Sequence, residues 1–175
     1  DEAYFEYSRH LEDYPDSMHY RYDNVITLRT FSKAHGLAGF RVGYGFAHDA
    51  LVENLLKVKL PFEPSWPAQV AAMAALDDTN FIEKTISNCK AGMQKMEMVF
   101  KEMELDYIPS AANFLTLVFN NEEEADSFSD SMLHKGIILR HLAGWGLPDC
   151  VRITIGQESE NEYLVTCLSE ILSEV

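Results

Sequence analysis

A long stretch in the middle of this chain repeats apolar side chains at spacings of three and four residues. The stretch runs from about residue 80 to about residue 105 of 175. Its apolar positions are Ile82, Ile86, Cys89, Met93, Met96, Phe100 and Met103. This spacing places side chains along one side of a helix. We therefore predict a single long helix whose methionine-rich stripe packs into a core, in preference to a methionine-lined binding surface.

The residues before this helix alternate between strand-like and helix-like patterns. Residues 1–7, 24–30 and 42–47 read as short strands. Asp49 predicts the cap of a helix that ends near residue 58, and Ser65 predicts the cap of a second helix that ends near residue 76. The first half of the chain is therefore expected to mix strands and helices.

A smaller set of elements follows the long helix. We predict strands over residues 113–119, 137–140 and 151–155. The acidic run at Glu122 predicts the start of a helix that ends at Gly136. Ser159 and Glu162 form a capping-box pattern for a final helix. These patterns alone predict a mixed α/β fold.

Composition and charge exclude several classes of function. The formal net charge of −14 argues against a nucleic-acid partner, because proteins that bind nucleic acid carry basic patches. We find no apolar run of membrane-spanning length, so we expect a cytoplasmic protein without a membrane partner. Cys89, Cys150 and Cys167 show no paired spacing and are expected to be buried free thiols, with no metal site and no disulfide.

Residues 30–44 combine the groups that bind a phosphorylated aldehyde. Lys33 lies between two hydroxyl residues, Thr30 and Ser32, and a glycine-rich segment that ends in Arg41. A lysine amine can form a Schiff base with an aldehyde. Hydroxyl donors and an arginine fork match phosphate oxygens. An aldehyde and a phosphate on one small molecule describe pyridoxal 5′-phosphate (PLP).

The order Ser-Lys-x-x-Gly-Leu-Ala-Gly-x-Arg-x-Gly-Tyr in this segment resembles the lysine segment of fold-type-I PLP-dependent aminotransferases. Asp1 and Tyr4 resemble the Asp-x-x-Tyr element of the same family. The resemblance implies that Lys33 is the catalytic residue and that Asp1 pairs with the pyridine nitrogen of the cofactor. It also implies that Tyr4 hydrogen-bonds the ring's phenolic oxygen and that Thr30, Ser32 and Arg41 hold the phosphate. His35 departs from the family, which usually carries a bulky aromatic there.

Two arginines near the end of the chain resemble the histidinol-phosphate aminotransferase branch of this family. Arg152 lies in Leu-Pro-Asp-Cys-Val-Arg-Ile-Thr-Ile-Gly, and Arg140 precedes it by twelve residues. In that branch both arginines meet the substrate phosphate, and two guanidinium forks suit a dianion. The resemblance implies that histidinol phosphate and 2-oxoglutarate react to imidazole acetol phosphate and glutamate in histidine biosynthesis.

Two other reactions stay open at this point. An aromatic amino-acid aminotransferase shares nearly every motif, and a threonine-phosphate decarboxylase, which is a lyase, also uses two arginines on a phosphate. The resemblance further implies that the chain is the C-terminal half of a homodimeric enzyme, and that the fragment alone is a poor catalyst or inactive. Residues 1–90 would then be the second half of the large PLP-binding domain, with a mostly parallel sheet and flanking helices. Residues 91–175 would form a small α+β domain, joined to the first by the helix over residues 80–105.

Overall fold

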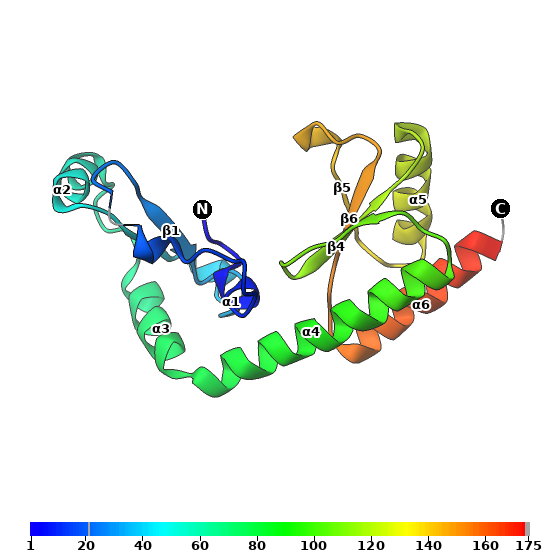
Figure 1. The fold of residues 1–175 in the computed structure, drawn as a ribbon, viewed down its shortest axis with the longest axis horizontal. Helices are drawn as coiled ribbons and strands as arrows, with labels where there is room; N and C mark the ends of the chain where they lie inside the picture. Colours follow the sequence, from blue (N-terminus) through cyan, green and yellow to red (C-terminus); the bar gives the residue numbers. More distant parts are fainter. Residues whose placement is uncertain (21, 174–175) are drawn as a thin grey trace. The chain divides into compact units, whose positions relative to one another are not determined.

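The structure of the chain is a computed structural model that describes residues 1–20 and 22–173. The chain divides into two compact units, Asp1–Ile86 and Ser87–Val175 (Figure 1). The boundary falls within the longest helix, α4 (Thr79–Glu102).

The first unit contains a two-stranded sheet and short helices. Its regular elements are α1 (Phe5–Ser8), β1 (Thr27–Thr30), β2 (Gly43–Phe46), α2 (Asp49–Val58) and α3 (Trp66–Asp77), with 3-10 turns at Ser17–His19 and Ala38–Phe40. Strands β1 and β2 pair antiparallel, with Thr30 opposite Gly43. A Cβ atom at residue 43 would lie 2.8 Å from the carbonyl oxygen of Arg29. Glycine at this position therefore lets the two strands approach each other.

A small apolar cluster packs α3 against the residues between the two strands. Its buried members are Phe31, Val42, Ala68 and Ala72. The two alanines lie four residues apart on α3, so they share one face of that helix. Because their side chains are short, α3 can lie close to the Phe31 ring. The cluster fixes the segment that contains Lys33.

The second unit is a four-stranded antiparallel sheet with helices. The strands are β3 (Tyr107–Ile108), β4 (Phe114–Val118), β5 (Arg140–His141) and β6 (Cys150–Thr154), in the order β3-β4-β6-β5. Leu115 pairs with Ile153, and Leu117 pairs with Val151. All four side chains are buried, so one face of the sheet is a continuous apolar surface.

Helices α4, α5 (Glu122–His134) and α6 (Glu158–Ser173) supply the rest of this core. On α4 the buried positions Cys89, Met96 and Phe100 follow the predicted apolar stripe. Helix α6 runs beside the later turns of α4 (Figure 1). A Cβ atom at Gly92 of α4 would lie 2.5 Å from the Cγ2 atom of Ile155, so glycine permits close packing there.

Several predicted elements are confirmed. Helix α2 ends at Val58 as expected, although His48 and not Asp49 caps it, by accepting the backbone N–H of Ala50 at 3.3 Å. The Ser65 hydroxyl caps α3, as predicted. The three cysteines are buried and free.

The predicted strand over residues 1–7 is wrong. This segment turns into the short helix α1, in which the Tyr4 carbonyl oxygen accepts the backbone N–H groups of Tyr7 and Ser8. The predicted strand over residues 137–140 shrinks to Arg140–His141. The reason is that the N–H of Ile137 bonds the carbonyl of Met132 at 2.9 Å and so closes the end of α5.

Two helix boundaries also differ from the predictions. Helix α4 ends at Glu102, not near residue 105, because Glu104 takes a left-handed conformation with φ of 56°. Helix α6 begins at Glu158, so Ser159 lies inside the helix and does not cap it. The Glu160 carboxylate instead accepts the backbone N–H of Gln157 at 2.7 Å.

The prediction of a mostly parallel sheet is not met by the strands in the described part of the chain, whose pairings are all antiparallel. Parallel neighbours need a long crossover connection. The residues between β1 and β2 contain one 3-10 turn and no crossover helix, so the chain returns antiparallel. The α/β class itself is confirmed.

Candidate functional site

Lys33 lies in a tight loop directly after β1. The backbone N–H of Leu37 bonds the Phe31 carbonyl oxygen at 2.9 Å and closes this loop. The Thr30 hydroxyl accepts the backbone N–H of Ser32 at 3.1 Å. Phe31 is buried on one side of the lysine and Ala34 on the other. These neighbours anchor the loop in the core and leave the lysine half-buried.

An open pocket of about 400 Å³ surrounds this lysine. Its lining residues are Asp1, Ala3, Leu28, Arg29, Thr30, Ser32, Lys33, Ala38 and Arg41. Five of the six residues predicted to bind the cofactor therefore converge on one pocket. The sixth, Tyr4, has its ring centroid 5.4 Å from the Nζ atom of Lys33. The structure therefore brings all six residues predicted to bind the cofactor close to one another within the first unit.

Arg41 and Asp1, which both line this pocket, are held by different local contacts. Arg41 has a left-handed backbone with φ of 54°, and its Nη1 atom donates to the Ala38 carbonyl oxygen at 2.7 Å. Asp1 is exposed, and its Oδ1 atom accepts the backbone N–H of Ala3 at 3.0 Å. The pocket lining therefore combines three cationic side chains, those of Arg29, Lys33 and Arg41, and two hydroxyls with one carboxylate. Such a set can hold an anionic group beside an amine.

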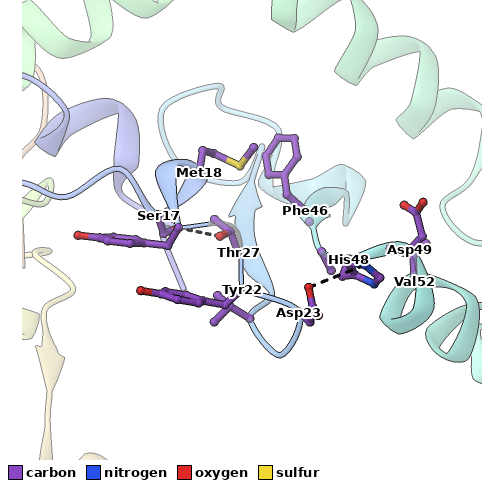
Figure 2. Close-up of a pocket in the computed structure, with 13 residues that line it drawn as sticks. Ser17, Met18, Tyr22, Asp23, Thr27, Phe46, His48, Asp49 and Val52 are labelled. Atoms are coloured by element: carbon purple, nitrogen blue, oxygen red, sulfur yellow. Dashed lines mark hydrogen bonds and ion pairs between the residues drawn. The ribbon is translucent and has the colours of Figure 1, made fainter.

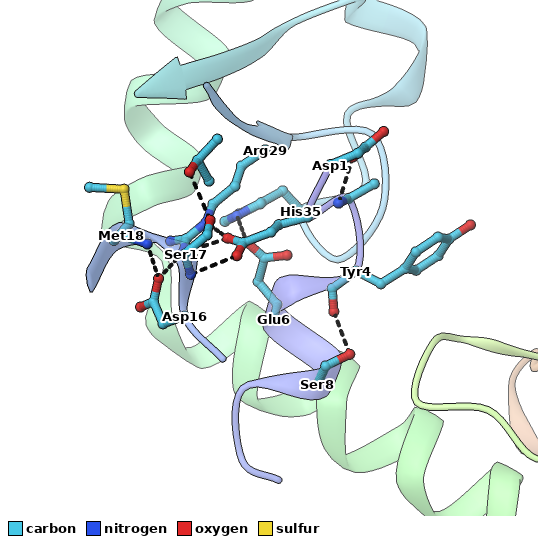
Figure 3. A network of polar contacts seen from close by, with 12 residues as sticks. Asp1, Tyr4, Glu6, Ser8, Asp16, Ser17, Met18, Arg29 and His35 are labelled. Carbon is cyan, nitrogen blue, oxygen red and sulfur yellow. Dashed lines mark hydrogen bonds and ion pairs between the residues drawn. The ribbon is translucent and has the colours of Figure 1, made fainter. Parts of the chain in front are cut away.

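A buried ionic network lies next to this pocket, and no pattern in the sequence predicts it (Figure 3). The Glu2 side chain is only 8% exposed. Its Oε1 atom accepts the backbone N–H of Ser17, and its Oε2 atom accepts the Nε–H of Arg29, both at 2.9 Å. Glu2 and Arg29 are 27 residues apart. No short-range spacing rule joins two residues so far apart.

The Arg29 guanidinium holds two acidic side chains at once. Its Nη2 atom lies 2.9 Å from both the Glu2 Oε2 atom and the Asp16 Oδ1 atom. Its Cζ atom also lies 3.4 Å from the centroid of the Phe5 ring. Burial alone lowers the pKa of Arg29, but the contacts with Glu2 and Asp16 outweigh burial and raise this pKa above its usual value.

The same contacts keep Glu2 ionised. Burial alone raises the pKa of the Glu2 carboxyl. The hydrogen bonds from Ser17 and from Arg29 outweigh burial and hold this pKa below its usual value of 4.5. The network therefore contains a buried carboxylate and a buried guanidinium that are both charged at neutral pH.

A second buried pair joins His35 of the lysine loop to Glu6 of α1. The His35 Nε2 atom is 3.5 Å from the Glu6 Oε1 atom, and both side chains are less than 10% exposed (Figure 3). The His35 ring lies 4.9 Å from the Phe31 ring, between centroids. Its Nδ1 atom is buried and has no hydrogen-bond partner among the described residues. At the position of the predicted departure from the family, the histidine ring is therefore buried against Phe31.

The second unit brings the two predicted substrate arginines together. Arg140 on β5 is the direct cross-strand partner of Arg152 on β6. Directly opposite residues of an antiparallel pair project from the same face of the sheet. The Cζ atom of Arg152 lies 5.0 Å from the Phe114 ring centroid, and that of Arg140 lies 5.9 Å from the Trp145 ring. Aromatic rings therefore flank both guanidinium groups.

Neither of these arginines forms an ion pair with any residue in the part of the chain that the structure describes. The Nε atom of Arg152 is buried and has no hydrogen-bond partner there. Like charges placed directly opposite each other destabilise a sheet, and an unpartnered buried donor adds a further cost. The arrangement therefore suits an anionic ligand.

A further pocket of about 420 Å³ in the first unit has a different chemistry (Figure 2). The His48 Nε2 atom lies 3.8 Å from the Asp23 Oδ1 atom, and the hydroxyls of Ser17 and Thr27 are 2.7 Å apart. Among its described lining residues there is no lysine and no arginine. The described lining of this pocket therefore lacks the cationic groups expected for a phosphorylated aldehyde.

Comparison with known proteins decides the family. The sequence profile of the family described as aminotransferase class I and II matches residues 1–168. The chain belongs to this family.

In the described residues, no helix has the length and apolar character needed to cross a membrane.

Individual relatives agree with this family. The chain is 40% identical to histidinol-phosphate aminotransferase 1 of Nitrosococcus oceani and 42% identical to the histidinol-phosphate aminotransferase of Halalkalibacterium halodurans. Each alignment covers 99% of this chain and 47% of the relative. The crystal structure of histidinol-phosphate aminotransferase from Sinorhizobium meliloti in complex with pyridoxal-5′-phosphate matches with a TM-score of 0.90 and 29% identity, over 99% of this chain and 48% of that one. The chain thus spans about half the length of these relatives.

Proposed function

We propose that this chain carries the cofactor lysine and the substrate arginines of a PLP-dependent aminotransferase. The observation that carries the proposal is the convergence of the predicted cofactor residues on the pocket around Lys33. The family match and the similarity to a PLP-containing structure support it. The proposal concerns the whole protein, of which this chain supplies these groups.

The residues of the pocket fit PLP. The amine of Lys33 can bond to the aldehyde carbon of the cofactor. Thr30, Ser32 and Arg41 supply hydroxyl and guanidinium donors for its phosphate. Asp1 supplies a carboxylate for the protonated ring nitrogen, and Tyr4 supplies a phenol close to the lysine. Each polar part of PLP therefore has a matching group on this chain.

When bound, PLP supplies an electron sink for carbanion chemistry at the substrate. The protein groups do the rest of the work. The Nζ atom of Lys33, as a free amine, would move a proton at the Cα atom of the substrate. The carboxylate of Asp1 stabilises a positive ring nitrogen, and Thr30, Ser32 and Arg41 hold the phosphate in place.

We propose histidinol phosphate as the amino donor and 2-oxoglutarate as the acceptor, in histidine biosynthesis. The facing pair of Arg140 and Arg152 supports a phosphorylated donor, because these arginines have no acidic partner among the described residues and two forks suit a dianion. The names of the relatives support the same donor. We further propose that residues 1–90 belong to the cofactor domain and residues 91–175 to the small domain of a cytoplasmic homodimer.

The proposal is tested by assaying the full-length protein with histidinol phosphate and with phenylalanine as amino donors. In the variant Arg140→Ala, the loss of one fork should weaken transition-state binding of histidinol phosphate by about 2–5 kcal/mol. Activity with phenylalanine should change little, because this donor has no phosphate. Arg9→Ala, which removes an exposed arginine of the first unit, is the matched control and should resemble the unmodified protein.

Three results would count against this substrate. Equal losses with both donors, or no loss with either, would favour an aromatic amino-acid aminotransferase. Release of carbon dioxide from threonine phosphate would favour the lyase. No transamination of any amino donor by the full-length, PLP-loaded protein would overturn the proposed reaction itself.

A further inference from the structure

The segment that carries Asp1 is held by side chains rather than by regular secondary structure. Asp1 to Tyr4 belong to no strand or helix. The backbone N–H of Glu2 donates to the Leu28 carbonyl oxygen at 2.8 Å, which attaches the segment to β1 at one point. The Glu2 side chain is a second attachment. What fixes the Glu2 side chain therefore also fixes the neighbouring Asp1.

Glu2 and Asp1 face different surroundings. Asp1 lines the lysine pocket, whereas the Glu2 carboxylate is buried and bonded to Ser17 and Arg29. The bond to Arg29 runs from two guanidinium nitrogens, Nε and Nη2, to the single Oε2 oxygen, and each distance is 2.9 Å. Such charge-assisted contacts restrict both side chains. The buried Glu2 carboxylate is thus held in one position, and it is adjacent in the chain to the exposed Asp1.

Arg29 is itself immobilised from three directions. Its guanidinium contacts Glu2 on one side and Asp16 on another, and the Phe5 ring lies 3.4 Å from its Cζ atom. The guanidinium is only 10% exposed. Because β1 carries both Arg29 and Thr30, the same strand positions this clamp and one hydroxyl of the lysine pocket.

We propose that Arg29 and Glu2 are positioning residues, which hold the Asp1 carboxylate in the lysine pocket where it meets the cationic ring nitrogen of the cofactor. This inference rests on the proposed function, because it gives Asp1 a role toward PLP. Neither Arg29 nor Glu2 is required to touch the cofactor. Their contribution passes through the placement of Asp1, as outer residues place the ligands of metal sites.

The test is a double-mutant cycle on PLP affinity in the full-length protein. The variants are Asp1→Asn, Glu2→Gln and the combination of both, and the dissociation constant of PLP is measured by spectral titration. Glu2→Gln should weaken PLP binding roughly tenfold, on the scale seen when outer partners of metal sites are lost. In the background of Asp1→Asn, the same change should alter affinity by less than about twofold, since coupled residues are not additive.

Two further variants serve as a substitute for Glu2→Gln and as a control. Arg29→Lys keeps the charge but loses the fork, and it replaces Glu2→Gln if that variant fails to give the native near-ultraviolet circular dichroism. Glu12→Gln changes an exposed glutamate of the first unit that has no part in this network, so its PLP affinity should stay close to that of the unmodified protein.

Distinct results separate this inference from the proposed function. If the losses of Asp1→Asn and Glu2→Gln multiply in the combined variant, Glu2 does not act through Asp1 and the inference is wrong, while the proposed function stands. If Glu12→Gln weakens PLP binding as much as Glu2→Gln does, the effect is not specific to the contact between Glu2 and Arg29, and the inference is likewise wrong. If Asp1→Asn binds PLP as tightly as the unmodified protein, both the role of Asp1 and the inference fail.

Discussion

The two units of this chain bury different kinds of side chain. Among the described residues, the eight largest side chains that are fully buried all belong to the second unit: Met96, Phe100, Leu115, Leu117, Met132, Val151, Ile153 and Leu168. The first unit instead buries the charged or ionisable groups of Glu2, Glu6 and His35 beside a small apolar cluster. The arginine pair therefore lies on a sheet with an apolar core, whereas the Asp1 segment of the lysine pocket is held by buried polar contacts of Glu2.

The two kinds of buried side chain also stabilise their surroundings in different ways. Apolar burial is non-directional, so it supports a sheet without fixing each polar atom. Charge-assisted hydrogen bonds are directional and specify position, but each is costly to break. A site in which a lysine, a carboxylate and hydroxyls must meet small groups of one ligand benefits from the second kind of support. The comparison yields four expectations.

Replacing Lys33 should distinguish the catalytic contribution of the first unit from the selective contribution of the second. Lys33→Ala in the full-length protein should lower kcat by about 10²–10⁴-fold with every amino donor, because the group that moves the proton is lost. Lys57→Ala, which removes a lysine on α2, should leave kcat unchanged. Steady-state kinetics with two donors measure this. An unchanged kcat in Lys33→Ala would show that the first unit does not supply the catalytic group through this lysine.

Removing a large apolar side chain should show how far the second unit depends on its core. Phe100→Ala should lower the free energy of unfolding by about 3–5 kcal/mol, because the ring is fully buried and leaves a cavity. Met98→Ala on the same helix is the control, since this methionine is 61% exposed, and should change stability by about 0.5 kcal/mol or less. Denaturant unfolding of the protein measures both. A loss below about 1 kcal/mol for Phe100→Ala would mean that the apolar core is not what stabilises the sheet.

The polar support of the first unit should depend on pH. The folded-state pKa of Glu2 lies below 4.5, so the unfolded state binds more protons as the pH falls through this range. The stabilisation by Glu2 is therefore present at neutral pH and is lost as the pH falls below about 4.5. Glu2→Gln should cost about 1.5–3 kcal/mol at pH 7, the range for hydrogen bonds to charged groups.

The control for this expectation is Glu83→Gln, which changes an exposed glutamate of the same unit. Unfolding curves from pH 7 to pH 3 should show the gap between Glu2→Gln and the unmodified protein closing with acid. A gap that stays constant with pH would show that Glu2 does not stabilise the fold through its charge.

The helix caps should give the smallest difference between the units. Asn121 caps α5 by accepting the N–H of Glu124 at 3.0 Å, and Ser65 caps α3 by accepting the N–H of Ala68 at 3.4 Å. Asn121→Ala should therefore cost about 1 kcal/mol of stability, and Ser65→Ala should cost less. Thermal unfolding of the two variants measures this. A larger loss of stability in Ser65→Ala than in Asn121→Ala would show that the hydrogen-bond distance does not decide the strength of these caps.

Some local features of the fold were predicted correctly from the sequence, and others were not. The apolar spacing along α4 and the Ser65 cap act within a few residues, and both predictions hold. The end of α4 was missed because the left-handed turn at Glu104 has no glycine to mark it. The strand over residues 1–7 was wrong because its residues close hydrogen bonds with one another instead of along a strand.

The candidate site divides in the same way. The lysine run could be found because its hydroxyls, glycines and arginine lie within one short segment. The clamp of Glu2 and Arg29 could not, since its partners are 27 residues apart and meet only after the chain folds. The opposition of Arg140 and Arg152 likewise depends on the register of β5 and β6, which the separate strand patterns do not specify.

The attachment point of the cofactor decides whether the lysine pocket has the proposed role. The full-length protein is loaded with PLP, reduced with borohydride and digested, and the peptides are mapped by mass spectrometry. The pyridoxyl group should lie on Lys33, because this lysine alone lies beside Asp1, Thr30 and Arg41 in the described pocket. A pyridoxyl group on Lys57 or Lys59 instead, with Lys33 unmodified, would contradict the assignment.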